Sequence, residues 1–190
     1  MNGRYGFFVF LMSLLSACAE IPERTISSEY RLGEMLYLQK QNHWSLSGRL
    51  ALVGEKDSLS ASIRWNHNQL SDEIELAGPL DQGRMKISVK PEEVVIDDGD
   101  KFTTYKGHAD DVVAGLLGVD MPVTALRYWV LGVYDPELAY IEQSGGFYQG
   151  EWLVRYGELQ KVGDKTLPKK MTAEKDKARI KLIVDEWNLM

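Results

Sequence analysis

The chain has 190 residues, of which 44% are hydrophobic and 26% are charged, and its formal net charge is -6 at pH 7. This length and composition fit one globular domain with a sizeable core. The negative charge argues against a nucleic-acid partner, because binding to phosphates requires clustered Lys and Arg.

The N-terminal segment predicts a secretory signal peptide over residues 1–17. Arg4 precedes an apolar run from Phe7 to Leu15, and the sequence LSAC that ends at Cys18 is similar to a bacterial lipobox. A lipobox cysteine becomes the acylated N-terminus of the mature chain, and each buried CH₂ contributes roughly 0.8 kcal/mol to membrane binding. We therefore expect lipidation at Cys18, the alternative being an ordinary signal peptide with a chance cysteine. Ala19 rather than Asp follows, which by the sorting rule of enteric bacteria predicts the outer membrane.

Residues 18–28 are polar and contain a proline, which indicates a lipidated N-terminus and tether ahead of a single domain over residues 29–190. A helix is predicted from about Glu29 to Gln41, with Ser27 or Ser28 as its cap. Its apolar stripe would be Leu32, Met35 and Leu36 at helical spacing.

Four consecutive segments then alternate between apolar and polar residues with a period of two, over residues 45–52, 59–65, 73–76 and 84–90. Each segment has one apolar and one polar face, which is typical of antiparallel strands in a meander. Turn-forming residues at 91–93 and 97–100 indicate further tight turns.

Residues 109–131 break this pattern. Apolar residues recur at helical spacing up to Gly118, which predicts the end of a first helix, and Pro122 suits the first turn of a second helix that ends at Gly132. Alternation returns at residues 152–156 and 180–184. The Gly-rich segment 145–150 is interpreted as a hairpin turn between strands.

These elements predict a mainly β fold with helices: one curved antiparallel sheet of about 10–11 strands, whose single apolar face is covered by a helical lid. The space between lid and sheet is either a packed core or a lipid-sized cavity, and the sequence leaves both open. The candidate residues of this cavity and lid are Leu50, Leu52, Ile63, Trp65, Leu76, Met85, Ile87, Leu116, Leu117, Leu126, Trp129 and Val130.

Sequence motifs for catalysis are missing. We find no phosphate-binding loop, no dinucleotide fingerprint and no nucleophile elbow, so neither an enzyme nor a cofactor is expected. The three histidines, His43, His67 and His108, show no metal-ligand spacing and are interpreted as surface or turn residues. The basic run from Lys169 to Lys181 is interpreted as solvated strand faces and a turn, with a weak patch for anionic lipid headgroups as the alternative.

Several motifs occur together in a fixed order. After the lipobox come GRLAL at 48–52 with SIRW at 62–65, GPL at 78–80, PVTALRYWVLG at 122–132 and IKLIVDEW at 180–187. In this order they resemble the LolB family, the outer-membrane receptors for lipoproteins in Gram-negative bacteria. The resemblance covers nearly all of the chain after Cys18.

The resemblance implies an unclosed half-barrel with a hydrophobic cavity. It also implies a monomer, lipid-anchored in the outer membrane and facing the periplasm. Such a protein takes acylated lipoproteins from the periplasmic carrier LolA and inserts them into the bilayer. By position, Pro79 and Leu80 would form the membrane-insertion loop. Two residues depart from the family pattern: Asp81 where Gly is usual, and Asp120 where Pro is common.

Two other functions stay open at this point. One is a lipid-anchored binding module for another hydrophobic ligand, such as a free lipid or quinone. The other is a structural envelope lipoprotein with a fully packed core.

Overall fold

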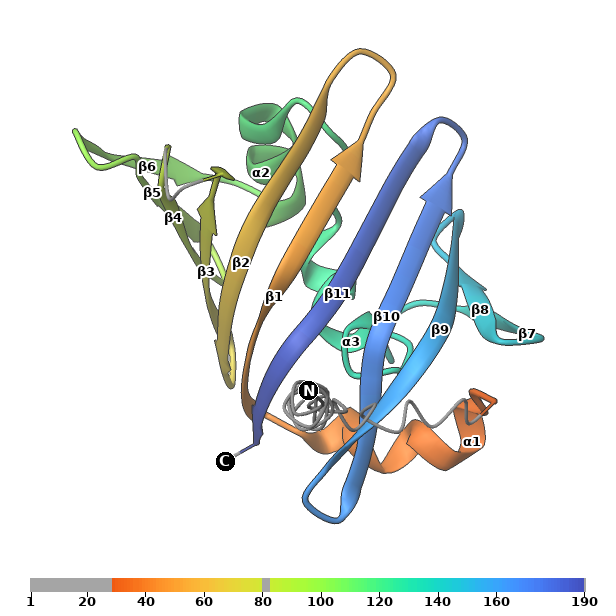
Figure 1. The fold of residues 1–190 in the computed structure, drawn as a ribbon. Helices are drawn as coiled ribbons and strands as arrows, with labels where there is room; N and C mark the ends of the chain where they lie inside the picture. Colours follow the sequence, from red (N-terminus) through yellow and green to blue (C-terminus); the bar gives the residue numbers. More distant parts are fainter. Residues whose placement is uncertain (1–28, 80–82, 190) are drawn as a thin grey trace, which may run out of the picture.

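The computed structural model describes residues 29–79 and 83–189, and it places eleven strands in one antiparallel sheet (Figure 1). The strand order is β6-β5-β4-β3-β2-β1-β11-β10-β9-β8-β7, so the sheet has two free edges and stays open. This confirms the predicted half-barrel and its strand number. The strands are β1 His43–Val53, β2 Ser58–Asn68, β3 Ser71–Ala77, β4 Met85–Lys90, β5 Glu93–Asp97, β6 Phe102–Lys106, β7 Tyr140–Gln143, β8 Gly146–Gln149, β9 Trp152–Val162, β10 Lys165–Lys175 and β11 Ala178–Leu189.

The first and last strands meet at the centre of the sheet. Leu50 of β1 pairs with Leu182 of β11 on one side and with Ala61 of β2 on the other, so the apolar faces of the two halves of the chain are continuous. The β1–β11 register shifts between Ser47 and Gly48. A Cβ atom at Gly48 would overlap the carbonyl oxygen of Ile183, which explains why glycine occupies this position.

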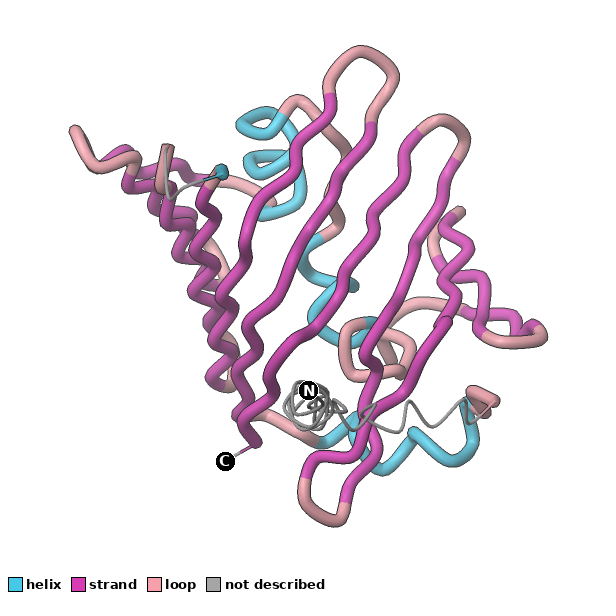
Figure 2. The backbone as a smooth tube through the Cα atoms, viewed as in Figure 1, coloured by secondary structure: helices cyan, strands magenta, loops and turns pink. Residues whose placement is uncertain are grey.

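The insert between β6 and β7 forms the helical lid. Helix α2 spans Ala109–Leu117 and ends at Gly118, whose φ of 67° is left-handed, as predicted for a helix stop. Helix α3 spans Val123–Trp129, so Pro122 is its N-cap rather than part of its first turn, and the helix ends three residues before the predicted Gly132. Figure 2 shows both helices on one side of the curved sheet, where they cover its concave face. Among the described residues, no helix has the length and apolar character needed to cross a membrane.

The N-terminal helix is shorter than predicted and changes type along its length. Helix α1 spans Leu32–Met35 and continues as the 3₁₀ helix η1, Leu36–Lys40. Since a 3₁₀ helix has three residues per turn, the buried stripe is Leu32, Met35 and Leu38, and Leu36 is exposed. The expected cap at Ser27 or Ser28 lies outside the described residues.

The Gly-rich segment 145–150 is mostly a strand and not the predicted hairpin turn. Gly146–Gln149 is strand β8, and the hairpin turn that precedes it lies at residues 144–145. A Cβ atom at Gly146 would overlap the carbonyl oxygen of Val154 in β9, so this glycine allows two strands to approach closely rather than forming the turn.

Candidate functional site

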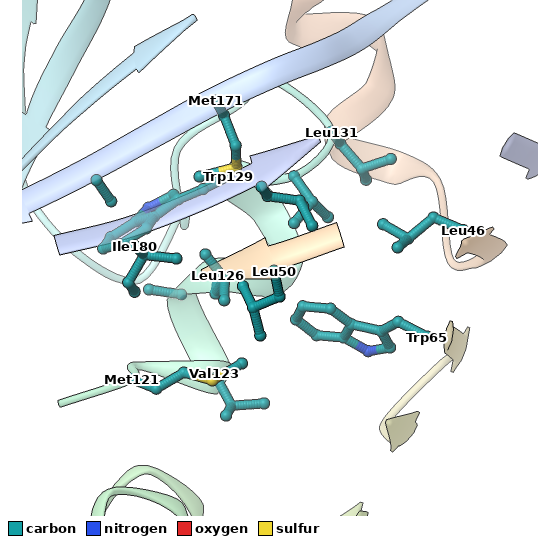
Figure 3. Close-up of a cluster of buried hydrophobic side chains, with 14 of the residues drawn as sticks. Leu46, Leu50, Trp65, Met121, Val123, Leu126, Trp129, Leu131, Met171 and Ile180 are labelled. Carbon is teal, nitrogen blue, oxygen red and sulfur yellow. The ribbon is translucent and has the colours of Figure 1, made fainter. Parts of the chain in front are cut away.

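The concave face of the sheet and the lid together form the candidate site. Figure 3 shows Leu46, Leu50 and Trp65 from the sheet pointing toward Leu126 and Trp129 from α3. The structure brings the predicted lining residues together here. Fully buried, at 4% exposure or less, are Leu50, Leu52, Ile63, Trp65, Leu76, Ile87, Leu126, Trp129 and Val130. Half-buried at the margin, and packed against this cluster, are Met85, Leu116 and Leu117.

The lid lies directly on the sheet in this structure. Trp65 and Trp129 are each 1% exposed and Ile87 is fully buried, so no water-sized space remains against these side chains. Of the two arrangements that the sequence leaves open, the described residues around Trp65, Trp129 and Ile87 have the packed one. An acyl chain could enter only if the lid moved away from the sheet.

A buried carboxylate joins the lid to the sheet. Asp72 of β3 is fully buried, and its Oδ2 lies 2.7 Å from a terminal guanidinium nitrogen of Arg127 in α3. Trp65 donates a hydrogen bond from Nε1 to Asp72 Oδ1 at 2.9 Å, and Nδ1 of His67 lies 2.8 Å from the same oxygen. Two strands and one lid helix therefore converge on a single side chain.

The Arg127–Asp72 contact is an ion pair rather than a directed hydrogen bond. Asp72 Oδ2 has no hydrogen-bond donor among the described residues, and Nε of Arg127 is buried without an acceptor among them. Removing both charges from water costs free energy that the attraction between them only partly offsets. The ion pair thus fixes the position of the lid while adding little net stability to the closed form.

A second set of hydrogen bonds holds the C-terminal end of α3. Trp129 donates from Nε1 to Oε1 of Gln149 at 2.8 Å, and the hydroxyl of Tyr156 donates to the carbonyl oxygen of Trp129 at 2.7 Å. Burial raises the pKa of Tyr156 well above its usual value, so this hydroxyl keeps its proton at any physiological pH. Tyr30 donates likewise to the carbonyl oxygen of Gly132 at 2.9 Å, just beyond the helix.

The two lid helices are also joined to each other. The side chain of Asp110 in α2 accepts hydrogen bonds from the backbone N–H of Thr124 at 3.0 Å and from its hydroxyl at 2.7 Å. These contacts tie the start of α3 to α2. Any movement of α3 away from the sheet should therefore carry α2 with it.

Sequence reasoning missed the polar part of this site. His67 is buried beside Asp72, so its interpretation as a surface or turn residue is wrong. The signal was present, because Asp72 precedes Ile74 by two residues and His67 follows Trp65 by two, which places both on the inward face. A carboxylate and an imidazole on the apolar face of adjacent strands indicate a buried polar pair.

Some predicted site residues have no structural description. Cys18, Leu80 and Asp81 lie outside the described residues. Pro79 is described and is exposed just beyond the end of β3. Within residues 29–79 and 83–189, no three His, Cys, Asp or Glu side chains lie close enough to hold a metal ion.

Comparison with known proteins agrees with this architecture. A family model described as outer membrane lipoprotein LolB matches residues 42–187. The outer-membrane lipoprotein LolB of Nitrosococcus oceani is 29% identical over 95% of this chain and 96% of its own length. The LolB protein of Alkalilimnicola ehrlichii is 28% identical over 93% of this chain and 92% of its own length. That of Thiobacillus denitrificans is 31% identical over 76% of this chain and 79% of its own length.

A solved structure shares the fold at low sequence identity. The crystal structure of a LolA superfamily protein from Nitrosomonas europaea has a TM-score of 0.52 and 7% identity, and the match covers 84% of this chain and 93% of that one. At this identity the likeness concerns the fold alone.

Proposed function

This chain belongs to the LolB family of outer-membrane lipoproteins, and on that premise we propose that it accepts lipoproteins from the soluble periplasmic carrier LolA and inserts them into the outer membrane. The observation that carries the proposal is the match to the family over residues 42–187, which includes the apolar concave face and the whole lid. The names of the relatives describe lipoproteins rather than enzymes, and we propose no catalytic step.

The lidded face suggests how an acyl chain is held. When α2 and α3 lift from the sheet, the apolar side chains of β1 to β4 lose their cover, and an acyl chain can replace the lid side chains that packed there. Each buried CH₂ contributes roughly 0.8 kcal/mol, so a long chain offsets much of the lost packing. No nucleotide is needed, because cargo moves from weaker to tighter binding and then to the bilayer.

The N-terminal part of the proposal rests on sequence. Residues 1–17 are removed as a signal peptide, Cys18 carries the acyl chains, and residues 18–28 tether a single monomeric domain over residues 29–190 to the membrane. Two acyl chains are enough to make such an anchor stable. The tether leaves the lid free to face the carrier in the periplasm.

Depletion tests the function as a whole. If this protein is removed from its host, lipoproteins should accumulate on the periplasmic carrier and disappear from the outer membrane. Unchanged delivery to the outer membrane would contradict the proposal. Native mass spectrometry without detergent checks the alternative of a free lipid or quinone, because a small ligand would remain bound. A purely structural lipoprotein would neither retain a ligand nor take up a hydrophobic fluorescent probe.

The membrane-insertion loop gives a sharper test. Leu80→Glu should leave lipoprotein binding intact but reduce transfer into vesicles at least tenfold, because a charged tip costs about 2–4 kcal/mol in hydrocarbon. Transfer of a labelled lipoprotein from carrier to vesicles measures this.

The control for Leu80→Glu is Leu70→Glu, at the turn between β2 and β3, where Leu70 is 68% exposed. This turn lies at the other end of β3 from the insertion loop, so transfer should stay normal. Equal loss of cargo binding and transfer in Leu80→Glu would show that the loop holds cargo instead of entering the bilayer.

A further inference from the structure

A groove crosses the convex face of the sheet, on the side away from the lid. Its volume is about 670 Å³, and its lining includes Arg49 and Ala51 of β1, Ser60 of β2, and Lys181 and Ile183 of β11. These residues alternate along their strands with the buried Leu50, Ala61 and Leu182, so their side chains point outward. Leu50 and Ala61 also border the groove, but their side chains are buried on the opposite face, so the groove and the candidate cargo site lie on the two faces of the sheet.

The lining of this groove is cationic although the chain as a whole is acidic. Arg49 and Lys181 are its charged residues, and it contains no Asp or Glu, whereas the formal net charge of the chain is -6. In the sheet Arg49 pairs with Ile183 and Ala51 pairs with Lys181, so the two cations are diagonal neighbours on adjacent strands. Diagonal positions are roughly 7–8 Å apart, within reach of one phosphate for two long side chains.

Lys181 differs from most of the basic run to which it belongs. Lys170 pairs with Glu158, Lys175 with Glu151, and Arg179 with Glu174. These pairs agree with solvated strand faces, as predicted for most of the run. Lys181 is exposed and forms no ion pair with a described residue. Arg49 forms an ion pair with the exposed Asp185, in which Nη2 lies 2.9 Å from Oδ1.

The groove also reaches the loop that the proposed function places at the bilayer. Gly78 and Pro79, which immediately precede Leu80, form one end of it. We propose that this groove binds the phosphate of an anionic phospholipid headgroup, with Lys181 and Arg49 as the cations and the Ser60 hydroxyl as a donor. Ile183 and Ala51 then face the glycerol and first methylene groups. The inference rests on the proposed function only in where it places the membrane.

Binding to vesicles without cargo tests the groove. The protein is the chain from residue 18 onward with Cys18→Ser, which cannot be acylated, and the vesicles contain phosphatidylcholine with or without phosphatidylglycerol. Affinity for vesicles with phosphatidylglycerol should fall about fivefold in Lys181→Gln, since a basic residue near an anionic surface contributes about that factor. Ser60→Glu, which puts a carboxylate into the groove, should lower the affinity at least as much.

The matched control is Lys106→Gln. Lys106 is exposed and pairs in the sheet with Glu93, at the end of β6 remote from Pro79. Its removal should change the affinity less than twofold. An unchanged affinity in Lys181→Gln, or an equal loss in Lys106→Gln, overturns the proposal.

These outcomes are distinct from those of the proposed function. The vesicle assay contains neither cargo nor carrier, so it can fail while Leu80→Glu still blocks transfer. Conversely, an intact groove would give the expected vesicle result even if the cargo were not a lipoprotein. Melting temperatures of the three variants should equal that of the parent, because all three positions are exposed.

Discussion

Replacing Asp72 by alanine should lower the free energy of unfolding by about 3–5 kcal/mol, because it leaves the cation of Arg127 buried without its partner. The same change removes the acceptor of the Trp65 indole N–H, which is also buried. Urea unfolding followed by tryptophan fluorescence measures the loss, with Trp65 itself as a reporter next to the site.

The control for Asp72→Ala is Glu73→Ala on the same strand. Glu73 faces outward and forms an ion pair with Lys86, and the side chains of Glu73 and Lys86 are 54% and 46% exposed. Its removal should cost less than about 1 kcal/mol. If both variants lost equal stability, the burial of Asp72 would be without energetic consequence, and its ion pair with Arg127 would not hold the lid on the sheet.

A double variant separates the contribution of the Arg127–Asp72 ion pair from that of the rest of the fold. Arg127→Met replaces the guanidinium by an apolar chain of similar length, and Asp72→Asn keeps an acceptor for Trp65 without the charge. Each single change leaves one charge buried alone, whereas the double variant leaves none. The loss in the free energy of unfolding of the double variant should therefore be smaller than the sum of the losses of the two single variants, by about 0.5–3 kcal/mol. Uptake of a hydrophobic fluorescent probe should be faster in it, since the charged link between lid and sheet is gone.

The strands were predictable because each carries a local signal. From β1 to β4 the alternation of apolar and polar residues continues over at least four positions, and the observed burial follows it almost residue by residue. The lid was predictable for the same reason, since Gly118 and Pro122 mark its helix boundaries in the sequence. The pairing of β1 with β11 was not, because nothing local in either strand specifies a partner more than a hundred residues away.

The polar contacts of the lid could not be predicted from the sequence. Asp72 and His67 sit on a predicted inward face, yet only the packing of α3 decides that Arg127 reaches them. Likewise, Gln149 lies within the segment 145–150 that the sequence predicts as a turn, and its role as the acceptor for Trp129 depends on β8 being a strand. Contacts between elements distant in sequence require the tertiary structure, whereas the faces of single elements do not.

Trp129→Ala should be the other strongly destabilising change, with a loss of about 3–5 kcal/mol in the free energy of unfolding. The side chain is 1% exposed, and the centroid of its ring lies 6.1 Å from the ring centroid of Trp152. Its removal therefore leaves a cavity between α3 and the sheet. Phe102→Ala is the control, because Phe102 on the edge strand β6 is 76% exposed and its loss should cost less than about 0.5 kcal/mol. An unchanged melting temperature in Trp129→Ala would mean that the lid is not packed on the sheet in solution.

Trp129→Phe divides this loss into packing and hydrogen bonding. Phenylalanine keeps most of the ring but has no N–H for Gln149, whose Oε1 still accepts the backbone N–H of Asp135 at 2.8 Å. Because that acceptor stays satisfied, Trp129→Phe should cost only about 1–2 kcal/mol. Apart from Gln149, the cavity in Trp129→Ala has apolar walls and should bind small hydrophobic probes. If the concave face holds acyl chains, this variant should take up a probe more readily than the parent although it is less stable. A variant that lost stability without gaining probe binding would place the acyl chains elsewhere.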